Sequence, residues 1–451
     1  MKQLKPITNK LLWIFALGQF GWSLLSGIVS NWMVYYYTGS PDAQNPNTGL
    51  FASGITQEPI LFKLTLFGLV LAAGRIFDAI TDPLIAGWSD RSSYKGGRRI
   101  PFMRAMAIPF SLCTIALFTI PQTASIGLND TLLFVLLMVF YLFMTMFCTP
   151  YNALIAELGD TQQHRINVST FISFTFIVGQ SISFLLPNVA GALEPSVGQY
   201  NSIRFAVAIM SAIACLAMLF PAFYIKERDY IESKPSETKP FASLIRTFSN
   251  VQFRHFVYSD VIYFFALTLF QTGLAFYETK LMGIPDTMTF TLTATMTAIS
   301  VCLYPLVNIL AKKIGKKSLI IIGFFAYSVV FAITSICGEG VHWGFIVAIT
   351  AAVPMAILGI LPQACVADVA ELTRLETGED RSGMFFAART FAFKMGQALA
   401  MVVFTSLTVS KTPQSYRTTA IFAFVTCFIG AVIFFTYNEK QIHKSIEAHK
   451  N

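Results

Sequence analysis

Three ionisable residues, Arg75, Asp78 and Asp82, interrupt an apolar stretch that runs from Ile60 to Trp88. Their spacing of three and four residues places them on one face of a helix. The stretch is long enough to span a membrane, and a charge at the centre of such a span costs about 2.5–3.5 kcal/mol to insert. Charges kept at that cost mark an ion or substrate path, or an ion-pair network that holds helices together.

The two carboxylates, Asp78 and Asp82, are one helical turn apart and can bind Na⁺ or share a proton. The counter-ion that we expect is Lys394, which lies in the middle of another apolar stretch. An unpaired lysine there is costly, so it should pair with Asp78, with Asp82 or with an anionic group of a substrate. The alternatives are that Lys394 snorkels to the membrane surface, or that these charges only hold helices together.

The composition indicates the class of protein that must position these residues. Of the 451 residues, 55% are hydrophobic and only 12% are charged, which is typical of a polytopic membrane protein. Apolar windows separated by short polar loops predict about twelve transmembrane helices. They lie at residues 11–38, 60–88, 101–121, 131–157, 166–192, 201–225, 252–279, 287–311, 318–337, 342–370, 384–409 and 416–437.

The net charge of +8 is explained by topology rather than by nucleic-acid binding. Lysine and arginine collect in alternate connections, so the positive-inside rule places both termini in the cytoplasm of a cell-membrane protein. The seven cysteines are scattered without a C-x-x-C spacing, and no histidine cluster suggests a metal. The chain has no phosphate-binding G-x-x-x-x-G-K-[ST] motif and no converging nucleophile and base, so we expect neither an ATP-driven pump nor an enzyme.

The two halves of the chain repeat. Pro83-Leu84 and Pro305-Leu306 lie at matching places in the second span of each half, and two further pairs follow in the same order. These are Pro150 with Pro362, and Gly179-Gln180 with Gly396-Gln397. The repeat predicts an all-α fold of two pseudo-symmetric six-helix bundles, with an N-terminal half at 1–225, a cytoplasmic linker at 226–250 and a C-terminal half at 251–451. This architecture is the major facilitator fold of alternating-access transporters.

Other polar residues in or near the spans are candidates for substrate contact or gating. Asn152 and Gln397 are amides inside spans, and Tyr35 belongs to an aromatic cluster at the end of the first span. Asp368 and Glu371 lie near the inner end of the tenth span, where they could clamp to basic residues in one conformation and release them in another. Their alternative role is that of ordinary charges at a helix end. The gating group that we expect contains Arg75, Asp90, Arg91, Asp368 and Glu371.

Over nearly its whole length the sequence resembles the glycoside-pentoside-hexuronide:cation symporter family, the melibiose-permease-like branch of the major facilitator superfamily. The most specific match is Arg75-x-x-Asp78-Ala79-x-x-Asp82-Pro83, followed by Asp90-Arg91 and Gly97-Arg98-Arg99-x-Pro101. Supporting matches are Tyr35-Tyr36-Tyr37-Thr38, Pro150-Tyr151-x-Ala153-Leu154, Asp368 with Glu371, Gly378-x-x-Arg381, and Lys394 before Gly396. The resemblance implies a sodium- or proton-coupled symporter with Asp78 and Asp82 in the cation site and Lys394 nearby.

Departures from the family pattern concern both sites that the resemblance implies. In the cation site, Cys148 replaces a fourth-span aspartate and Thr81 replaces an asparagine, and we assign Thr81 and Thr145 as hydroxyl ligands. In the sugar site, Ser23 falls where the family has an aspartate and Ile172 near where it has an arginine. These losses argue against a melibiose-like galactoside. The loss of a carboxylate at Cys148 in the cation site favours H⁺ coupling, altered Na⁺ affinity or loss of coupling.

The functional prediction is cation-coupled symport of a sugar, glycoside or related small organic solute. The Asp-Ala-Ile-Thr-Asp-Pro run and the segment that begins at Pro150 also resemble sodium-dependent lysophospholipid symporters, so an amphipathic solute is the alternative. A facilitator without cation coupling is a third possibility. We expect no cofactor beyond the coupling ion, a small solute and membrane lipid as partners, and a monomer.

Overall fold

The computed structural model describes residues 5–38, 54–56, 59–61, 64–92, 94, 96–121, 124–158, 162–230, 240–377 and 382–450. The chain forms two compact units. Unit 1 contains Met1–Gln57 and Ile80–Lys239, and unit 2 contains Glu58–Ala79 and Pro240–Asn451. Helix α2 (Leu66–Arg91) starts in unit 2 and continues into unit 1 beyond Ala79.

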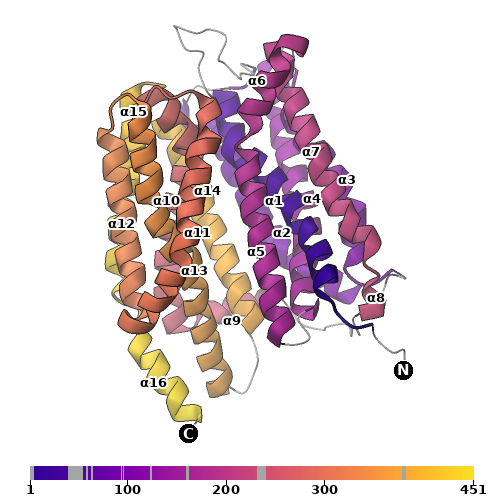
Figure 1. Cartoon of the computed structure of the whole chain (residues 1–451), viewed down its shortest axis with the longest axis vertical. Coiled ribbons are helices and arrows are strands. Elements are labelled where there is room, and N and C mark those ends of the chain that lie inside the picture. The colour runs from indigo at the N-terminus through magenta and orange to yellow at the C-terminus, as the bar shows by residue number, and fades with distance from the viewer. Residues whose placement is uncertain are drawn as a thin grey trace. The chain divides into compact units, whose positions relative to one another are not determined.

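Unit 1 is built from helices (Figure 1). Besides the later part of α2, they are α1 (Asn9–Thr38), α3 (Ile100–Leu117), α4 (Ile126–Leu158), α5 (Gln162–Ser183), α6 (Leu186–Val197), α7 (Gln199–Tyr224) and α8 (Glu227–Tyr230).

Unit 2 adds one short antiparallel hairpin to its helices. Its elements, besides the start of α2, are β1 (Pro59–Leu61), β2 (Leu64–Thr65), α9 (Pro240–Phe248), α10 (Val251–Phe276), the π-helix η1 (Tyr277–Leu281), the 3-10 helix η2 (Asp286–Met288), α11 (Thr289–Ile314), α12 (Lys316–Ile336), α13 (Val341–Thr377), α14 (Ser382–Leu407), α15 (Pro413–Phe434) and α16 (Glu439–Lys450).

The two units repeat the same internal packing. In unit 1, α1 packs on α5 and α7, while α3 packs on α4 and α7. In unit 2, α10 packs on α14 and α15, while α12 packs on α13 and α15. Glycines allow the equivalent close approaches, because a Cβ on Gly179 of α5 would lie 2.1 Å from Ser23 Oγ of α1, and a Cβ on Gly396 of α14 would lie 2.5 Å from the Val261 carbonyl oxygen of α10.

Among the described residues, ten helices are long and apolar enough to cross a membrane, or eleven if the bent pair α5–α6 is one span. Helix α2 is not among them, because Arg75, Asp78 and Asp82 make it too charged. The prediction of an all-α membrane protein is therefore confirmed, while the count of twelve spans depends on whether α2 crosses the membrane with its charges.

Two predicted spans begin or continue differently in the structure. The span expected to begin at residue 60 is a hairpin up to Thr65, and the helix begins at Leu66 because the Thr65 hydroxyl accepts a hydrogen bond from the Gly68 N–H at 3.1 Å. The span expected at 166–192 bends by 42° between α5 and α6. Pro187 at the start of α6 explains the break, because its ring has no N–H to donate to the preceding turn.

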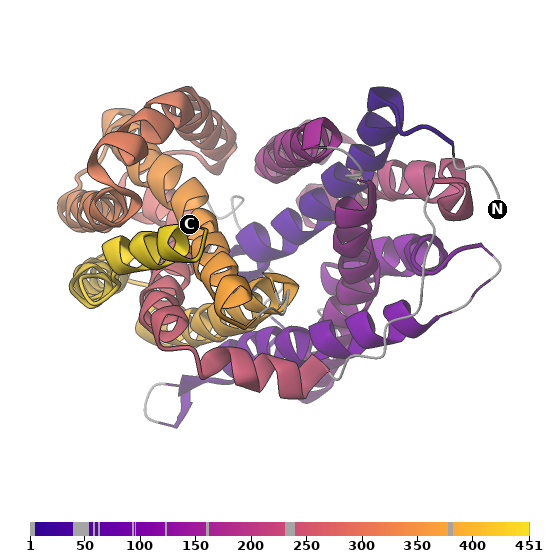
Figure 2. The ribbon, with the colours of Figure 1, turned by 90° about the horizontal axis from the view of Figure 1, so that it is seen from below.

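The segment expected to be a linker contains short helices. Helix α8 follows α7 in unit 1, and α9 precedes α10 in unit 2. Helix α9 lies across the end of the unit 2 helices rather than along them, and α16 extends from the same end (Figure 2). Helix α16 was not predicted.

Candidate functional site

A buried ion pair joins α2 to α14. Lys394 Nζ lies 2.8 Å from Asp78 Oδ2, and the Asp78 side chain is fully buried in unit 2. Asp78 is one of the partners that the sequence left open for Lys394. Opposite charges at this distance in an apolar bundle stabilise one another strongly, and either alone would be costly.

The next turn of α2 carries oxygen atoms that face α4 within unit 1. The Thr81 hydroxyl donates to Thr145 Oγ1 at 3.4 Å, and both side chains are buried. Asp82 is half-buried and its Oδ1 accepts a hydrogen bond from the Thr149 hydroxyl at 3.2 Å. Carboxylate and hydroxyl oxygens are ligands suited to hard cations. Sequence reasoning missed Thr149, although it lies between Cys148 and Pro150, both of which the family comparison had used.

A second buried ion pair lies between α10 and α14. Arg389 donates to both carboxylate oxygens of Asp260, at 2.7 Å from Nε and 2.9 Å from Nη2. Both side chains are buried, and the guanidinium lies 5.6 Å from the ring centre of Phe264. This bidentate pair ties the two helices together. It was missed, although Asp260 is a charge inside a predicted span, which is the signal that identified Asp78.

The candidate substrate residues have different environments. Ser23 is fully buried, and its hydroxyl donates to the Phe20 carbonyl at 3.0 Å within α1. Tyr35 is buried, and its ring packs edge-on against Trp32 with 5.7 Å between the ring centres. Asn152 on α4 is exposed, and Gln397 on α14 is half-buried. Asn152 and Gln397 are therefore the more accessible of the four, and their role in substrate binding stays a prediction.

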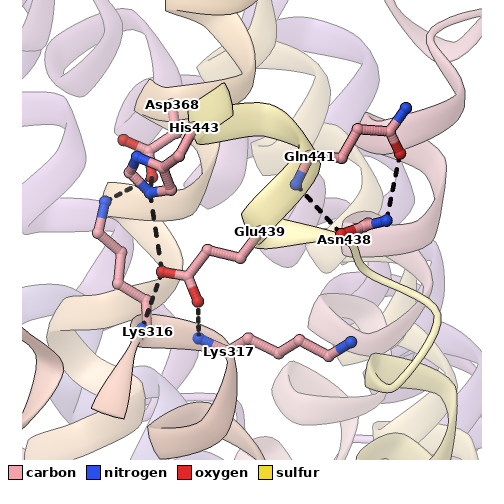
Figure 3. Close-up of polar contacts among 7 residues, drawn as sticks. All are labelled: Lys316, Lys317, Asp368, Asn438, Glu439, Gln441 and His443. Atoms are coloured by element: carbon pink, nitrogen blue, oxygen red, sulfur yellow. Dashed lines mark hydrogen bonds and ion pairs between the residues drawn. The ribbon is translucent and has the colours of Figure 1, made fainter. Parts of the chain in front are cut away.

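Among the candidate gating residues, Asp368 forms an ion pair with another helix. Its carboxylate on α13 accepts from Lys316 Nζ at the start of α12, and His443 Nε2 of α16 lies 3.6 Å from the same oxygen (Figure 3). His443 Nε2 is also 3.8 Å from Glu439 Oε1. These residues link α12, α13 and α16 at one end of unit 2. The histidine was not expected there.

The other gating candidates lie on α2 and α13. Glu371 pairs with Arg374 one turn further along α13, with both carboxylate oxygens 2.8 Å from guanidinium nitrogens. Arg75 is half-buried and Arg91 is exposed, both on α2. The side chain of Asp90, like the Gly378-x-x-Arg381 motif, lies outside the described residues.

Each unit has a glutamate that caps the third helix of its repeat. Glu227 of α8 accepts hydrogen bonds from the N–H groups of Arg98, Arg99 and Ile100 at 2.8–3.0 Å, at the start of α3. Glu439 of α16 accepts from the N–H groups of Lys316 and Lys317, both at 2.9 Å, at the start of α12 (Figure 3). A carboxylate at a helix N-terminus satisfies unpaired N–H groups and favours the helix dipole. This repeated contact was not visible in the sequence.

The family model described as "MFS/sugar transport protein" matches residues 14–437. The sequence is similar to an uncharacterized symporter, sll1374, of Synechocystis sp., with 24% identity over 78% of this chain and 82% of the relative. It is also similar to the sodium-dependent lysophosphatidylcholine symporter 1-A of Danio rerio, with 23% identity over 75% of this chain and 69% of the relative.

The fold is similar to that of a solved bacterial homologue of the human drug peptide transporters PepT1 and PepT2. The TM-score is 0.69, and the match covers 95% of this chain and 98% of the other. At 13% identity this similarity concerns the fold.

Proposed function

Because the chain belongs to the MFS/sugar transport protein family, we propose that it is a Na⁺- or H⁺-coupled symporter of a sugar, glycoside or related small organic solute, working by alternating access. Family membership makes it a multi-pass membrane secondary transporter and not an enzyme. The observation that carries the coupling proposal is the fully buried Asp78 carboxylate, which is paired with Lys394 at 2.8 Å.

In this proposal the coupling cation competes with Lys394 for Asp78. Cation binding neutralises the carboxylate and frees the ammonium group, which can then bind a polar or anionic group of the solute. On the following turn of α2, Asp82 with Thr149 and Thr81 with Thr145 present further oxygens that suit Na⁺. Proton coupling needs only the carboxylates.

The gating part of the proposal rests on Asp368. Its ion pair with Lys316 ties α13 to α12, and because both side chains are only half-buried, the pair can break and re-form at low cost. Arg75, Asp90, Arg91 and Glu371 remain proposed gating residues. We also propose that both termini are cytoplasmic, that the protein resides in the cell membrane, and that it works as a monomer without a resident cofactor.

An amphipathic solute is the second candidate. One relative is named a lysophosphatidylcholine symporter, and aromatic side chains lie along the surface between α1 and α5. Trp13 stacks on Phe171 with ring centres 4.2 Å apart and contacts Phe174, which is 57% exposed. Such rings suit an acyl chain as well as the bilayer.

The first experiment identifies the solute and the ion. A thermal-shift screen of the purified protein with sugars, glycosides, uronates and lysolipids gives candidates for uptake into vesicles with imposed Na⁺ or H⁺ gradients. Gradient-driven accumulation of a sugar or glycoside supports the proposal, and accumulation of a lysolipid alone supports the second candidate. Uptake that neither gradient drives indicates a facilitator and refutes coupling.

Substitutions then test the coupling residues. Asp78→Asn and Asp82→Asn should each abolish gradient-driven accumulation. Asp229→Asn is the matched control, because it removes an aspartate that pairs with Lys5 outside the spans. If Asp78→Asn and Asp82→Asn both accumulate solute as the parent does, the cation-site assignment is wrong.

A further inference from the structure

Unit 2 contains a buried acidic residue that the coupling proposal does not use. Helix α10 ends in the π-helix η1, and Glu278 lies in this turn with 2% of its surface exposed. π-Helical turns are rare and occur often at functional sites. The position of Glu278 therefore needs an explanation beyond helix formation.

The Glu278 carboxyl has a hydroxyl partner and no ion-pair partner within the described ranges. Its Oε2 is hydrogen-bonded to the Thr289 hydroxyl at the start of α11. Asp286 of η2 adds a like charge nearby, and Lys280 follows in η1. The Tyr277 hydroxyl is bonded to Thr419 of α15 at 2.9 Å. An ionised carboxylate buried in this way would lack the compensation that Lys394 gives to Asp78.

A small cavity lies against Glu278. Its wall is mostly apolar, and the residues that α13 contributes to it are uncharged. Glu278 and Thr293 are polar residues of this lining. Its apolar side chains include Phe270, Leu274, Met282, Leu292 and Met296. The Thr293 side chain is 5% exposed, and its hydroxyl has no hydrogen-bond partner among the described residues. The cavity volume of about 10 Å³ is close to the room that one water molecule needs.

We propose that Glu278 is a proton-binding site of this transporter, separate from the α2 carboxylates, and that it carries the proton as a neutral carboxylic acid hydrogen-bonded to Thr289. The cavity holds one water between the carboxyl group and the Thr293 hydroxyl, which gives the proton a route. Proton uptake converts the carboxylate to the acid, and exposure of the site to water releases the proton again. This inference rests on the proposed transport function and assigns it a proton.

A spectroscopic experiment tests protonation independently of transport. The infrared spectrum of the purified parent at neutral pH should contain the C=O band of a protonated carboxyl group. The spectrum of Glu278→Gln should lack this band. Asp286→Asn is the matched control, since it removes a neighbouring carboxyl that is only half-buried, and it should keep the band. A band that survives in Glu278→Gln, or is absent from the parent, overturns the proposal.

The transport experiment tests whether this proton is used. In vesicles with a pH gradient, Glu278→Gln should reduce proton-driven accumulation about tenfold or more, within the usual range of coupling between two ligands. Asp286→Asn should accumulate solute as the parent does, and elution and thermal stability should show that both variants are folded. If Glu278→Gln accumulates solute as the parent does, the proposal is wrong even if the infrared band is present. If the parent transports no solute, the proposed transport function is refuted. The infrared experiment then still decides whether Glu278 is protonated.

Discussion

Neutralising one partner of the Asp78–Lys394 pair should destabilise the protein far more than neutralising both. At 2.8 Å and an effective dielectric constant of about 20, the attraction between the two charges is about 6 kcal/mol, before the cost of removing them from water. Either Asp78→Asn or Lys394→Met leaves one buried charge uncompensated, which typically costs about 3–5 kcal/mol. The double variant removes both charges and should recover about 3 kcal/mol of that loss.

The assay is a double-mutant cycle. The free energy of unfolding is measured in mixed micelles for the parent, both single variants and the double variant, and gradient-driven uptake is measured in vesicles for the same four. We expect the double variant to be folded yet unable to accumulate solute. Such a result separates a coupling role from a purely structural one. If the pair were purely structural, removing both charges would leave a folded protein that still accumulates solute.

The Asp260–Arg389 pair provides the matched control. It is also buried in unit 2 and also involves α14, and it is joined by two hydrogen bonds. Asp260→Asn with Arg389→Leu should recover stability relative to either single change and should keep gradient-driven accumulation. If the doubly substituted control loses accumulation as completely as the Asp78–Lys394 double variant, loss of any buried pair stops transport, and our reasoning about Asp78 is refuted.

Three further outcomes test the fold and the gate. Glu227→Ala should destabilise the protein by about 2 kcal/mol and Glu439→Ala by about 1 kcal/mol, because loss of Glu227 frees three N–H groups and loss of Glu439 frees two. Chemical unfolding measures both free energies, and equal losses would contradict this prediction. Gly396→Ala should lower the thermal stability, because its Cβ meets backbone, whereas Gly359→Ala has open space and should be neutral or stabilising; similar melting temperatures would refute the close approach. Asp368→Asn should release the ends of α12 and α13, seen as faster hydrogen exchange there, and unchanged exchange would count against the gate.

Much of this fold could be predicted because a membrane imposes simple requirements. Span length and hydrophobicity predicted the helices, and the cost of a buried charge predicted that Lys394 needs an anionic partner. The α2 motif indicated a sugar:cation symporter family of the major facilitator superfamily. The match of residues 14–437 to the MFS/sugar transport protein family confirms this resemblance. Gly179 and Gly396, found as a weak internal repeat, proved to be equivalent helix contacts in the two units.

Other features could not be predicted from local patterns. The hairpin before α2 was missed because Ile60 and Leu61 are as apolar as a span, and only Thr65 signals the start of the helix. The caps formed by Glu227 and Glu439 join segments more than a hundred residues apart, and a charged segment in sequence does not show which helix end it contacts. Glu278 lies at the end of the predicted span 252–279, where the sequence alone does not show whether a charge is buried.

The most direct test of the central proposal is accumulation of the identified solute in vesicles that contain either the parent or Asp78→Asn, under the ion gradient that drives the parent. We expect the parent to concentrate the solute above its external level and Asp78→Asn, although inserted and folded, not to do so. Equal accumulation by the two proteins would contradict the assignment of Asp78 as the residue through which the cation drives transport.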